Sequence, residues 1–317
     1  MEHPHAFNVS GPRKLPSINW KDLINSTWKD PNYKRTVMAC FIQAVYLLQL
    51  DAQENRSKEN GLAPKWWKPF NYRLVEALID ERDASIFGAI LEWDRAAALQ
   101  QLLLIKPSGA PRAVLALRGT LLKAPTARRD IQDDLRFLAW ESLKGSVRFA
   151  AGLTALRCLS DKYGSANVCI AGHSLGAGFA LQIGKELAKQ GVCVEAHLFN
   201  PPSVSFKSVG GMVWTRIKSL LPLRGGGDGS RSVVETEMKQ WMPHLYVNNS
   251  DYICCYYSDA EVSGGAKVFV AAKGKQRFVE AHGLEQWWSD DLEMEMALNN
   301  SKLISRQLQS LYSSKNP

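Results

Sequence analysis

The strongest constraint on the fold is a short apolar segment followed by a serine between glycines. Val168, Cys169 and Ile170 form an apolar run with β-branched residues, typical of a strand covered on both faces of a sheet. Residues 172–176, Gly-His-Ser-Leu-Gly, then match G-x-S-x-G, a sharp turn that exposes a serine between a strand and a helix. Residues 179–188 continue with helical periodicity. The segment therefore predicts a strand, a tight turn and a helix in succession.

The context favours a nucleophile over an ordinary turn. The alternative is a glycine-rich turn whose serine only caps the helix. With a strand before it and a helix after it, we expect Ser174 to be a nucleophile. Gly172 and Gly176 would then be the small residues that let strand and helix pass closely. The N–H of Leu175, at the helix start, would help to hold an oxyanion.

The length of the chain allows one or two domains, and its composition is that of an ordinary globular protein. The chain has 317 residues, of which 45% are apolar and 22% charged. The first residues contain no basic segment followed by an apolar run, and the longest apolar stretch, residues 37–50, is too short to cross a membrane. These features predict an intracellular, cytoplasmic protein without signal peptide or transmembrane segment.

The cysteines and the charged residues argue against a disulfide-stabilised protein, a zinc protein and a nucleic-acid-binding protein. The six cysteines lie mostly in apolar runs, which indicates reduced, buried thiols rather than a disulfide framework. Their spacing does not resemble a zinc site, and we expect no metal. The formal charge is +8, but Lys and Arg are dispersed and no basic-aromatic recognition motif occurs. We therefore expect no nucleic-acid partner.

Strands that alternate with helices predict a mostly parallel α/β sheet with right-handed crossovers. Strands are expected at residues 85–93, 113–117, 168–170, 192–199, 244–249 and 266–272, with 102–106 as a further candidate. Helices are expected at residues 33–53, 70–81, 130–142, 146–163 and 285–312.

The predicted organisation is a single domain in several parts. Residues 1–84 form an N-terminal arm and helices, residues 85–290 a catalytic core, and residues 291–317 a C-terminal helix. Residues 203–243 interrupt the alternation with a short basic amphipathic segment and a glycine run. We interpret them as an insertion before the acid-bearing strand. Whether this insertion is a lid with peripheral membrane contact or an ordinary surface excursion stays open.

The histidine partner of Ser174 follows from chain order, since in this architecture an acid and then a histidine come after the serine. Of the six histidines, His282 comes late enough, in a polar loop after the last predicted strand. We therefore expect it to be the general base. His197 lies within a predicted strand and is expected in the core. His173 is the immediate neighbour of the serine and is expected to point elsewhere on the turn.

The acid and the second oxyanion donor are expected at strand ends. Asp251 follows the predicted strand 244–249 and fits the acid best, with Asp259 as the alternative. Its role would be to fix the imidazole tautomer. Arg118-Gly119-Thr120 follows the strand 113–117. Gly119 would let the backbone approach a substrate, and the N–H and hydroxyl of Thr120 could donate to an oxyanion.

Together these residues resemble the class 3 lipase family of α/β-hydrolases, in particular plant members labelled "GDSL esterase/lipase-like". The resemblance covers about residues 110–290 and is carried, in order, by Leu-Ala-Leu-Arg-Gly-Thr at 115–120, Ile-Gln-Asp-Asp-Leu at 131–135, residues 170–178, Phe-Asn-Pro-Pro at 199–202, Tyr-Val-Asn-Asn-Ser-Asp at 246–251 and Glu-Ala-His-Gly-Leu at 280–284. The serine itself lies in Gly-His-Ser-Leu-Gly, so the "GDSL" label does not describe its motif.

The resemblance implies a serine carboxylester hydrolase that acts on acyl lipids or smaller esters. It assigns Ser174, Asp251 and His282 to a triad, and Thr120 and Leu175 to an oxyanion hole. The chain also departs from the family. Val-Arg-Phe at 147–149 stands where a histidine is usual, and the segment 121–126 is short where fungal relatives carry a lid.

We therefore expect an enzyme that cleaves acyl esters through an acyl-enzyme on Ser174, without metal or organic cofactor. Two other functions remain open. One is a lipase-like signalling or scaffold protein that keeps the fold without turnover. The other is an acyltransferase or thioesterase with the same three residues, since the residue types do not decide the acceptor.

Overall fold

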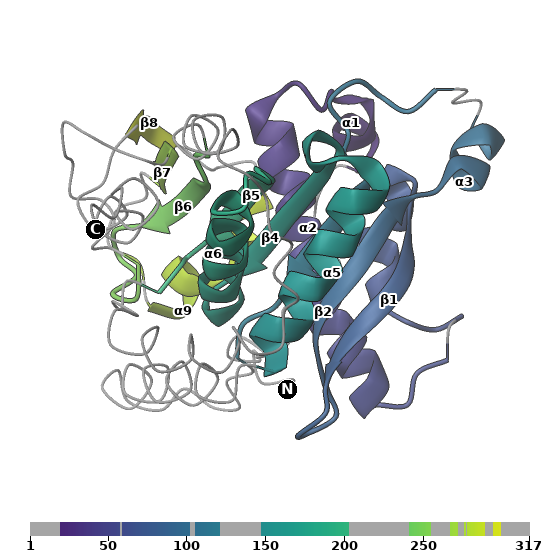
Figure 1. Cartoon of the computed structure of the whole chain (residues 1–317), viewed down its shortest axis with the longest axis horizontal. Coiled ribbons are helices and arrows are strands. Elements are labelled where there is room, and N and C mark those ends of the chain that lie inside the picture. Colours follow the sequence, from purple (N-terminus) through teal and green to yellow (C-terminus); the bar gives the residue numbers. More distant parts are fainter. Residues whose placement is uncertain are drawn as a thin grey trace, which may run out of the picture.

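An eight-stranded sheet forms the centre of the protein, with its strands in sequence order (Figure 1). The computed structural model describes residues 20–57, 59–101, 105–120, 147–202, 241–254, 267–271, 276, 278–288 and 294–298. Strands β3 to β7 pair in parallel, whereas β1, β2 and β8 join the edges in antiparallel pairs. The strands are β1 (Tyr72–Asp80), β2 (Ser85–Trp93), β3 (Ala113–Leu117), β4 (Val168–His173), β5 (Glu195–Phe199), β6 (His244–Asn248), β7 (Lys267–Ala271) and β8 (Met294–Leu298). The predicted fold class, α/β with a mostly parallel sheet flanked by helices, is confirmed.

Helices cover both faces of the sheet. The helix α2 (Pro31–Gln53) lies on one face, and α5 (Val147–Tyr163) and α6 (Leu175–Ala188) lie on the other (Figure 1). Because strand side chains alternate between faces, β3 contributes Leu115 to the core beneath α5 and α6 and Ala116 to the core beneath α2. The shorter helices are α1 (Trp20–Asn25), η1 (Ala63–Trp66), η2 (Lys68–Phe70), α3 (Arg95–Gln100), η3 (Ser165–Asn167), α9 (Phe278–His282) and η7 (Leu284–Trp288).

Helix α2 is buried along most of its length and packs as a core element. It begins at Pro31, where the ring sets a helical backbone angle, and the carboxylate of Asp30 accepts the N–H of Asn32 as a cap. The buried guanidinium of Arg35 donates to the carbonyl of Trp287, 3.0 Å away, which ties α2 to the chain after β7. The predicted helix 33–53 is thus confirmed, and it is a central part of the fold.

The predicted helix over 70–81 is wrong, because these residues form the edge strand β1. Its partner is β2, in an antiparallel hairpin closed at residues 81–84. Ala84 takes a positive φ of 56° in this turn, a position where glycine or asparagine usually marks a hairpin. The exposed side chains of Val75 and Ile79, 47% and 52% accessible, fit an outer edge. Without the turn signal, the spacing of apolar residues favoured a helix.

The predicted C-terminal helix is also wrong where it can be compared. Residues 284–288 form the 3-10 helix η7 rather than an α-helix, and residues 294–298 form β8, which pairs with β7. Of the predicted insertion at 203–243, residues 203–240 lie outside the described residues. The predicted helix 130–142 and residues 102–104 of the candidate strand 102–106 also lie outside them. Of the helices in the described ranges, none combines the length and the apolar character needed to cross a bilayer.

An ion-pair cluster attaches α5 to the β1–β2 hairpin. Asp80, whose side chain is fully buried, accepts Nε of Arg148 at 2.6 Å and is also bonded by Arg82 at 2.7 Å. Arg148 thus docks α5 against the edge of the sheet. Its bonds, after those of Arg82, lower the pKa of Asp80 against the opposing effect of burial.

We expect Asp80→Asn to lower the free energy of unfolding by about 2 kcal/mol at pH 7, because the substitution removes the buried charge that both Arg82 and Arg148 bond. Since the folded-state pKa is below the unfolded value of about 3.9, the stabilisation is complete above that pH and shrinks as the pH falls further. Urea denaturation of both proteins from pH 7 to pH 2 measures this convergence. A difference that stayed constant down to pH 2 would contradict the role of the carboxylate charge.

Candidate active site

The carboxyl ends of the parallel strands bring distant residues together. Ser174 follows β4, Asp251 lies after β6, and His282 ends the helix α9 that follows β7. In parallel sheets the strand ends meet at one edge, which is where α/β proteins bind ligands. All three side chains are buried, at 3%, 0% and 3% residual exposure respectively. The sequence order serine, acid, histidine thus converges at one place in space.

Ser174 occupies a strained turn. Its backbone has φ 53° and ψ −125°, a region that residues with a side chain rarely adopt. Its N–H donates to the carbonyl of Phe199 at 2.9 Å, which attaches the turn to β5. Its side chain makes no capping hydrogen bond to α6. The alternative of a serine that only caps the helix is therefore not what the structure shows.

The side chain of Ser174 is instead directed to His282. The distance from its Oγ to Nε2 of His282 is 3.0 Å, and Nδ1 of the same ring lies 2.8 Å from Oδ2 of Asp251. A carboxylate only accepts, so Nδ1 carries the hydrogen and Nε2 accepts the serine hydroxyl. This is the arrangement in which an imidazole can remove a proton from a serine.

The carboxylate of Asp251 remains charged despite its complete burial. Burial alone would raise its pKa, but the neighbouring His282, the amide of Asn200 and the N–H of Ile253 lower it overall. The Ile253 N–H donates to Oδ1 at 3.0 Å, and the thiol of Cys254 lies 3.2 Å from Oδ2. The acid is therefore held on both oxygens and oriented toward the imidazole.

Asn200 is a further polar residue of the site that sequence reasoning did not assign. It follows β5 with a positive φ of 47° and is fully buried. Its amide nitrogen donates to Oδ2 of Asp251 at 2.8 Å and to the carbonyl of Ala281 at 2.9 Å, while its oxygen accepts the indole N–H of Trp287 at 2.7 Å. It thus joins the acid to the segment that carries His282. The Asn-Pro-Pro after a strand end was the available signal.

Two groups near Ser174 can donate to a developing negative charge. Leu175 is the first residue of α6, so its N–H has no partner within the helix. In the part of the chain that the structure describes, Thr120 Oγ1 is buried and has no hydrogen-bond partner. Thr120 follows β3, beside β4 in the sheet. Both were predicted for this role from the sequence, and the role stays a proposal.

The predicted small residues of the turn are explained by close backbone contacts. A Cβ on Gly176 would lie 2.6 Å from the carbonyl oxygens of both Leu117 and Arg118. A Cβ on Gly119 would lie 2.8 Å from Cβ of Ser174. The serine turn and the chain after β3 therefore approach each other more closely than side chains allow.

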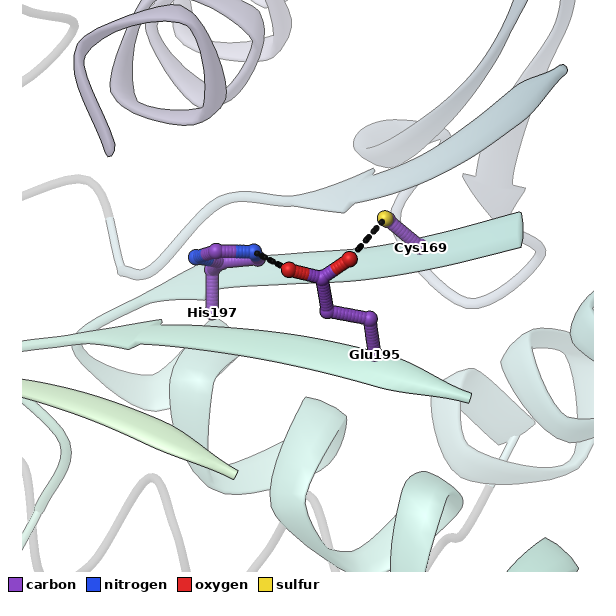
Figure 2. Close-up of side chains that lie close together, drawn as sticks. All are labelled: Cys169, Glu195 and His197. Carbon is purple, nitrogen blue, oxygen red and sulfur yellow. Dashed lines mark hydrogen bonds and ion pairs between the residues drawn. The ribbon is translucent and has the colours of Figure 1, made fainter. Parts of the chain in front are cut away.

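A second polar cluster lies on the central strands β4 and β5, toward the ends where these strands begin. Cys169 on β4 and Glu195 and His197 on β5 place a sulfur, a carboxylate and an imidazole nitrogen within 4.8 Å of one another (Figure 2). Cys169 precedes Ser174 by five residues, about 16 Å along an extended strand. The cluster is thus separate from Ser174. The cysteine spacing gave no sign of it, but the alternation of Glu195 and His197 along a strand could have.

These three residues could serve as metal ligands by type, but they already form a charge-balanced network. Both oxygens of Glu195 accept Nζ of Lys34, at 3.0 and 3.1 Å, and one also bonds His197 at 3.1 Å. His197 and Lys34 lower the pKa of Glu195, although burial opposes this. A metal ion would have to displace the ammonium of Lys34. The cluster is best explained as an ion pair that attaches α2 to the sheet.

Comparison with known proteins finds a curated relative and several solved structures, among them two fungal lipases. The Arabidopsis thaliana protein named "GDSL esterase/lipase" is 28% identical, in an alignment that covers 91% of this chain and 96% of the relative. The solved lipase of Rhizopus microsporus var. chinensis is 13% identical with a TM-score of 0.41, covering 89% of this chain and 84% of its own. Lipase II of Rhizopus niveus is 12% identical with a TM-score of 0.44, and the match covers 90% of this chain and 92% of the lipase. No family model matches the chain.

Proposed function

We propose that the chain is a serine hydrolase of the lipase and esterase type, which cleaves acyl esters through a Ser-His-Asp triad. The observation that carries this proposal is the continuous hydrogen-bonded series from Ser174 through His282 to Asp251, with distances of 3.0 and 2.8 Å. The strained backbone of Ser174 adds to it, because strain of this kind persists where the surrounding structure imposes it and is concentrated at functional sites.

The first step forms an acyl-enzyme. Oγ of Ser174 attacks the ester carbonyl carbon while its proton passes to Nε2 of His282. The carbonyl oxygen becomes an oxyanion, which accepts the N–H of Leu175 and the N–H and hydroxyl of Thr120. Asp251 stabilises the imidazolium that forms. The tetrahedral intermediate then expels the alcohol, which takes the proton from His282.

The second step returns the free enzyme. A water molecule gives a proton to Nε2 of His282 and attacks the acyl carbon. The same oxyanion donors hold the second tetrahedral intermediate. Its collapse breaks the bond to Oγ of Ser174, and the serine regains its proton from His282. The products are a carboxylic acid and the alcohol released earlier, and no metal or organic cofactor takes part.

The name of the curated relative and the motifs of the chain both support the acyl-ester class. The curated Arabidopsis relative is named an esterase/lipase, and its alignment with this chain covers nearly its full length. The motifs at 115–120, 170–178 and 280–284 also resemble those of class 3 lipases, from which we infer a lipid-derived acyl ester as substrate. The nucleophile in Gly-His-Ser-Leu-Gly belongs to the lipase-type turn rather than to a Gly-Asp-Ser-Leu motif.

The direct test is labelling by a fluorophosphonate, which reacts with activated serines. We expect the wild type to be labelled and Ser174→Ala to be unlabelled, since the phosphonyl group attaches to Oγ. Ser160→Ala is the matched control, because Ser160 is also buried but its hydroxyl bonds within α5 to the carbonyl of Leu156. Hydrolysis of p-nitrophenyl esters of increasing acyl length then defines the substrate range.

Labelling that persists in Ser174→Ala would place the nucleophile elsewhere. A folded wild type that the probe does not label, checked by circular dichroism, would overturn the enzymatic proposal. It would favour the scaffold function, in which a partner-dependent phenotype survives Ser174→Ala.

A further inference from the structure

His173, the residue before the nucleophile, is buried at 2% exposure with both ring nitrogens bonded. Its Nδ1 lies 2.8 Å from the hydroxyl oxygen of Tyr46, and its Nε2 lies 2.8 Å from the main-chain carbonyl oxygen of His282. The hydroxyl oxygen of Tyr46 also accepts the N–H of Gly119 at 2.8 Å. This series joins helix α2, the chain after β3, the serine turn and the end of α9.

The positions of the hydrogens in this series follow from the partners. A carbonyl oxygen only accepts, so Nε2 of His173 carries the hydrogen and donates it to His282. In a neutral ring Nδ1 is then bare and accepts the hydroxyl of Tyr46. The oxygen of Tyr46 is left as acceptor for the N–H of Gly119. Each donor has one acceptor, and the geometry specifies a single tautomer.

The surroundings keep both side chains neutral. Burial lowers the pKa of His173 to about 3, helped by the nearby His282 and opposed by Asp251. Burial also raises the pKa of the Tyr46 phenol, with the buried Arg118 opposing it. The titratable groups that face this pair are Arg118 after β3, Asp251 after β6 and His282 on α9. The series does not change its hydrogen-bond roles at neutral pH.

We propose that Tyr46 and His173 are positioning residues, which fix the main chain of His282 and the turn at Gly119 relative to Ser174. This inference rests on the proposed function, since it assigns these residues to the geometry of the same reaction. The imidazole and the oxyanion donor at Thr120 belong to segments that follow different strands, β7 and β3. The Tyr46–His173 pair bonds to both segments and to the serine turn itself. It also makes α2, within the N-terminal 84 residues, a part of the active site.

The physical reason is the precision that the reaction demands. A displacement of about 1 Å can cost a hundredfold in rate even when the moving group is not itself reacting. The main chain of His282 accepts from His173, and its ring bonds to Asp251 and Ser174. Loss of the main-chain anchor leaves the ring free to move away from Oγ. Loss of the Tyr46 hydroxyl also leaves the N–H of Gly119, next to Thr120, without its acceptor.

Tyr46→Phe tests the proposal, because it removes one hydroxyl and keeps the ring. We expect kcat for a short p-nitrophenyl ester to fall by about tenfold to a hundredfold, with KM within about twofold. The rate constant of fluorophosphonate labelling should fall in parallel. Tyr72→Phe is the matched control. Tyr72 is also buried, and its hydroxyl donates to the carbonyl of Pro111 at 2.6 Å, away from the site. We expect Tyr72→Phe to lower Tm by about as much as Tyr46→Phe does, and to leave kcat unchanged.

Two substitutions of His173 separate its two bonds. Asn at 173 keeps an oxygen near the position of Nδ1, so it can accept from Tyr46 but cannot reach His282. Gln at 173 keeps an N–H near the position of Nε2, so it can donate to the His282 carbonyl. We expect His173→Asn to lose at least tenfold more kcat than His173→Gln, because the bond to His282 positions the base. Nitrogen-15 NMR of the histidine rings should show His173 protonated on Nε2 and not titrating between pH 5 and pH 8.

The outcomes distinguish this inference from the proposed function. If the wild type is labelled and Tyr46→Phe and His173→Asn keep kcat within twofold, the positioning role is overturned and the hydrolase proposal stands. If these variants lose only Tm, their role is purely structural and the inference fails. If the wild type itself is not labelled, both fail together. A selective fall in kcat, with KM and the Tyr72→Phe control unchanged, supports it.

Discussion

Asp251→Asn is expected to lower kcat by about four orders of magnitude while KM stays nearly unchanged. The carboxylate accepts the hydrogen on Nδ1 of His282, 2.8 Å away. An amide can present its NH2 group there instead, which favours the tautomer with the hydrogen on Nε2. That nitrogen faces Oγ of Ser174, and once protonated it cannot accept the serine hydrogen. The measurement is steady-state hydrolysis of a p-nitrophenyl ester, with thermal unfolding to verify the fold.

The matched control for this substitution is Asp259→Asn, at the other acid that the sequence offered. We expect it to keep kcat within about threefold of the wild type, because the hydrogen bond to His282 comes from Asp251. A larger loss in Asp259→Asn than in Asp251→Asn would exchange the two assignments. A loss below tenfold in Asp251→Asn would contradict the role of the acid altogether.

The parts of the fold that could be predicted are those with local signals. The buried strands β3 and β4 are short apolar runs bounded by polar or glycine residues, and the turn at Ser174 has its own motif. Strand and helix alternation then determines a parallel sheet, whose strand ends meet at one edge. For this reason chain order pointed to His282, and the position after a predicted strand end favoured Asp251 over Asp259. The structure brings Ser174, Asp251 and His282 together.

The parts that could not be predicted depend on pairing between distant segments. The sequence of β1 predicts a helix because the hairpin turn contains Ala84 at positive φ rather than glycine, so no turn signal separates β1 from β2. β8 exists as a strand through its antiparallel pairing with β7, for which nearby residues give no signal. In both cases the segment becomes a strand because of the strand it pairs with. The periodicity of nearby residues carries no information about that partner.

The same limit applies to the site. Tyr46 lies in an apolar helical run, where a tyrosine ordinarily indicates the core, and its partner His173 is 127 residues away. Asn200 is within a recognised motif, yet its bonds to Asp251 and Ala281 require the loops after β6 and β7 to be in place. Residues that perform a step can be chosen by type and order. Residues that position them are defined by contacts across the fold.

Gly172→Ala is the second substitution with a large expected effect. A Cβ at this position would overlap the carbonyl oxygen of Gly176, and it would lie 2.6 Å from the carbonyl carbon of Gly176 and 2.7 Å from the nitrogen of Ala177. All three are backbone atoms of α6, so relief requires the helix start to move. We expect a loss of about 3 kcal/mol or more in the free energy of unfolding, measured by urea denaturation. Because Ser174 and Leu175 lie between these positions, any protein that still folds should also lose activity about a hundredfold.

Gly152→Ala is the control that separates a backbone clash from the mere addition of a methyl group. Its Cβ would lie 2.7 Å from Cδ1 of Ile183, the far end of a flexible side chain that can rotate away. Gly152 lies within α5, where alanine is favoured over glycine by about 1 kcal/mol. We therefore expect its stability to stay within about 1 kcal/mol of the wild type, with full activity. If Gly172→Ala behaved in the same way, the close approach of β4 and α6 would not be what holds Ser174 in its strained conformation.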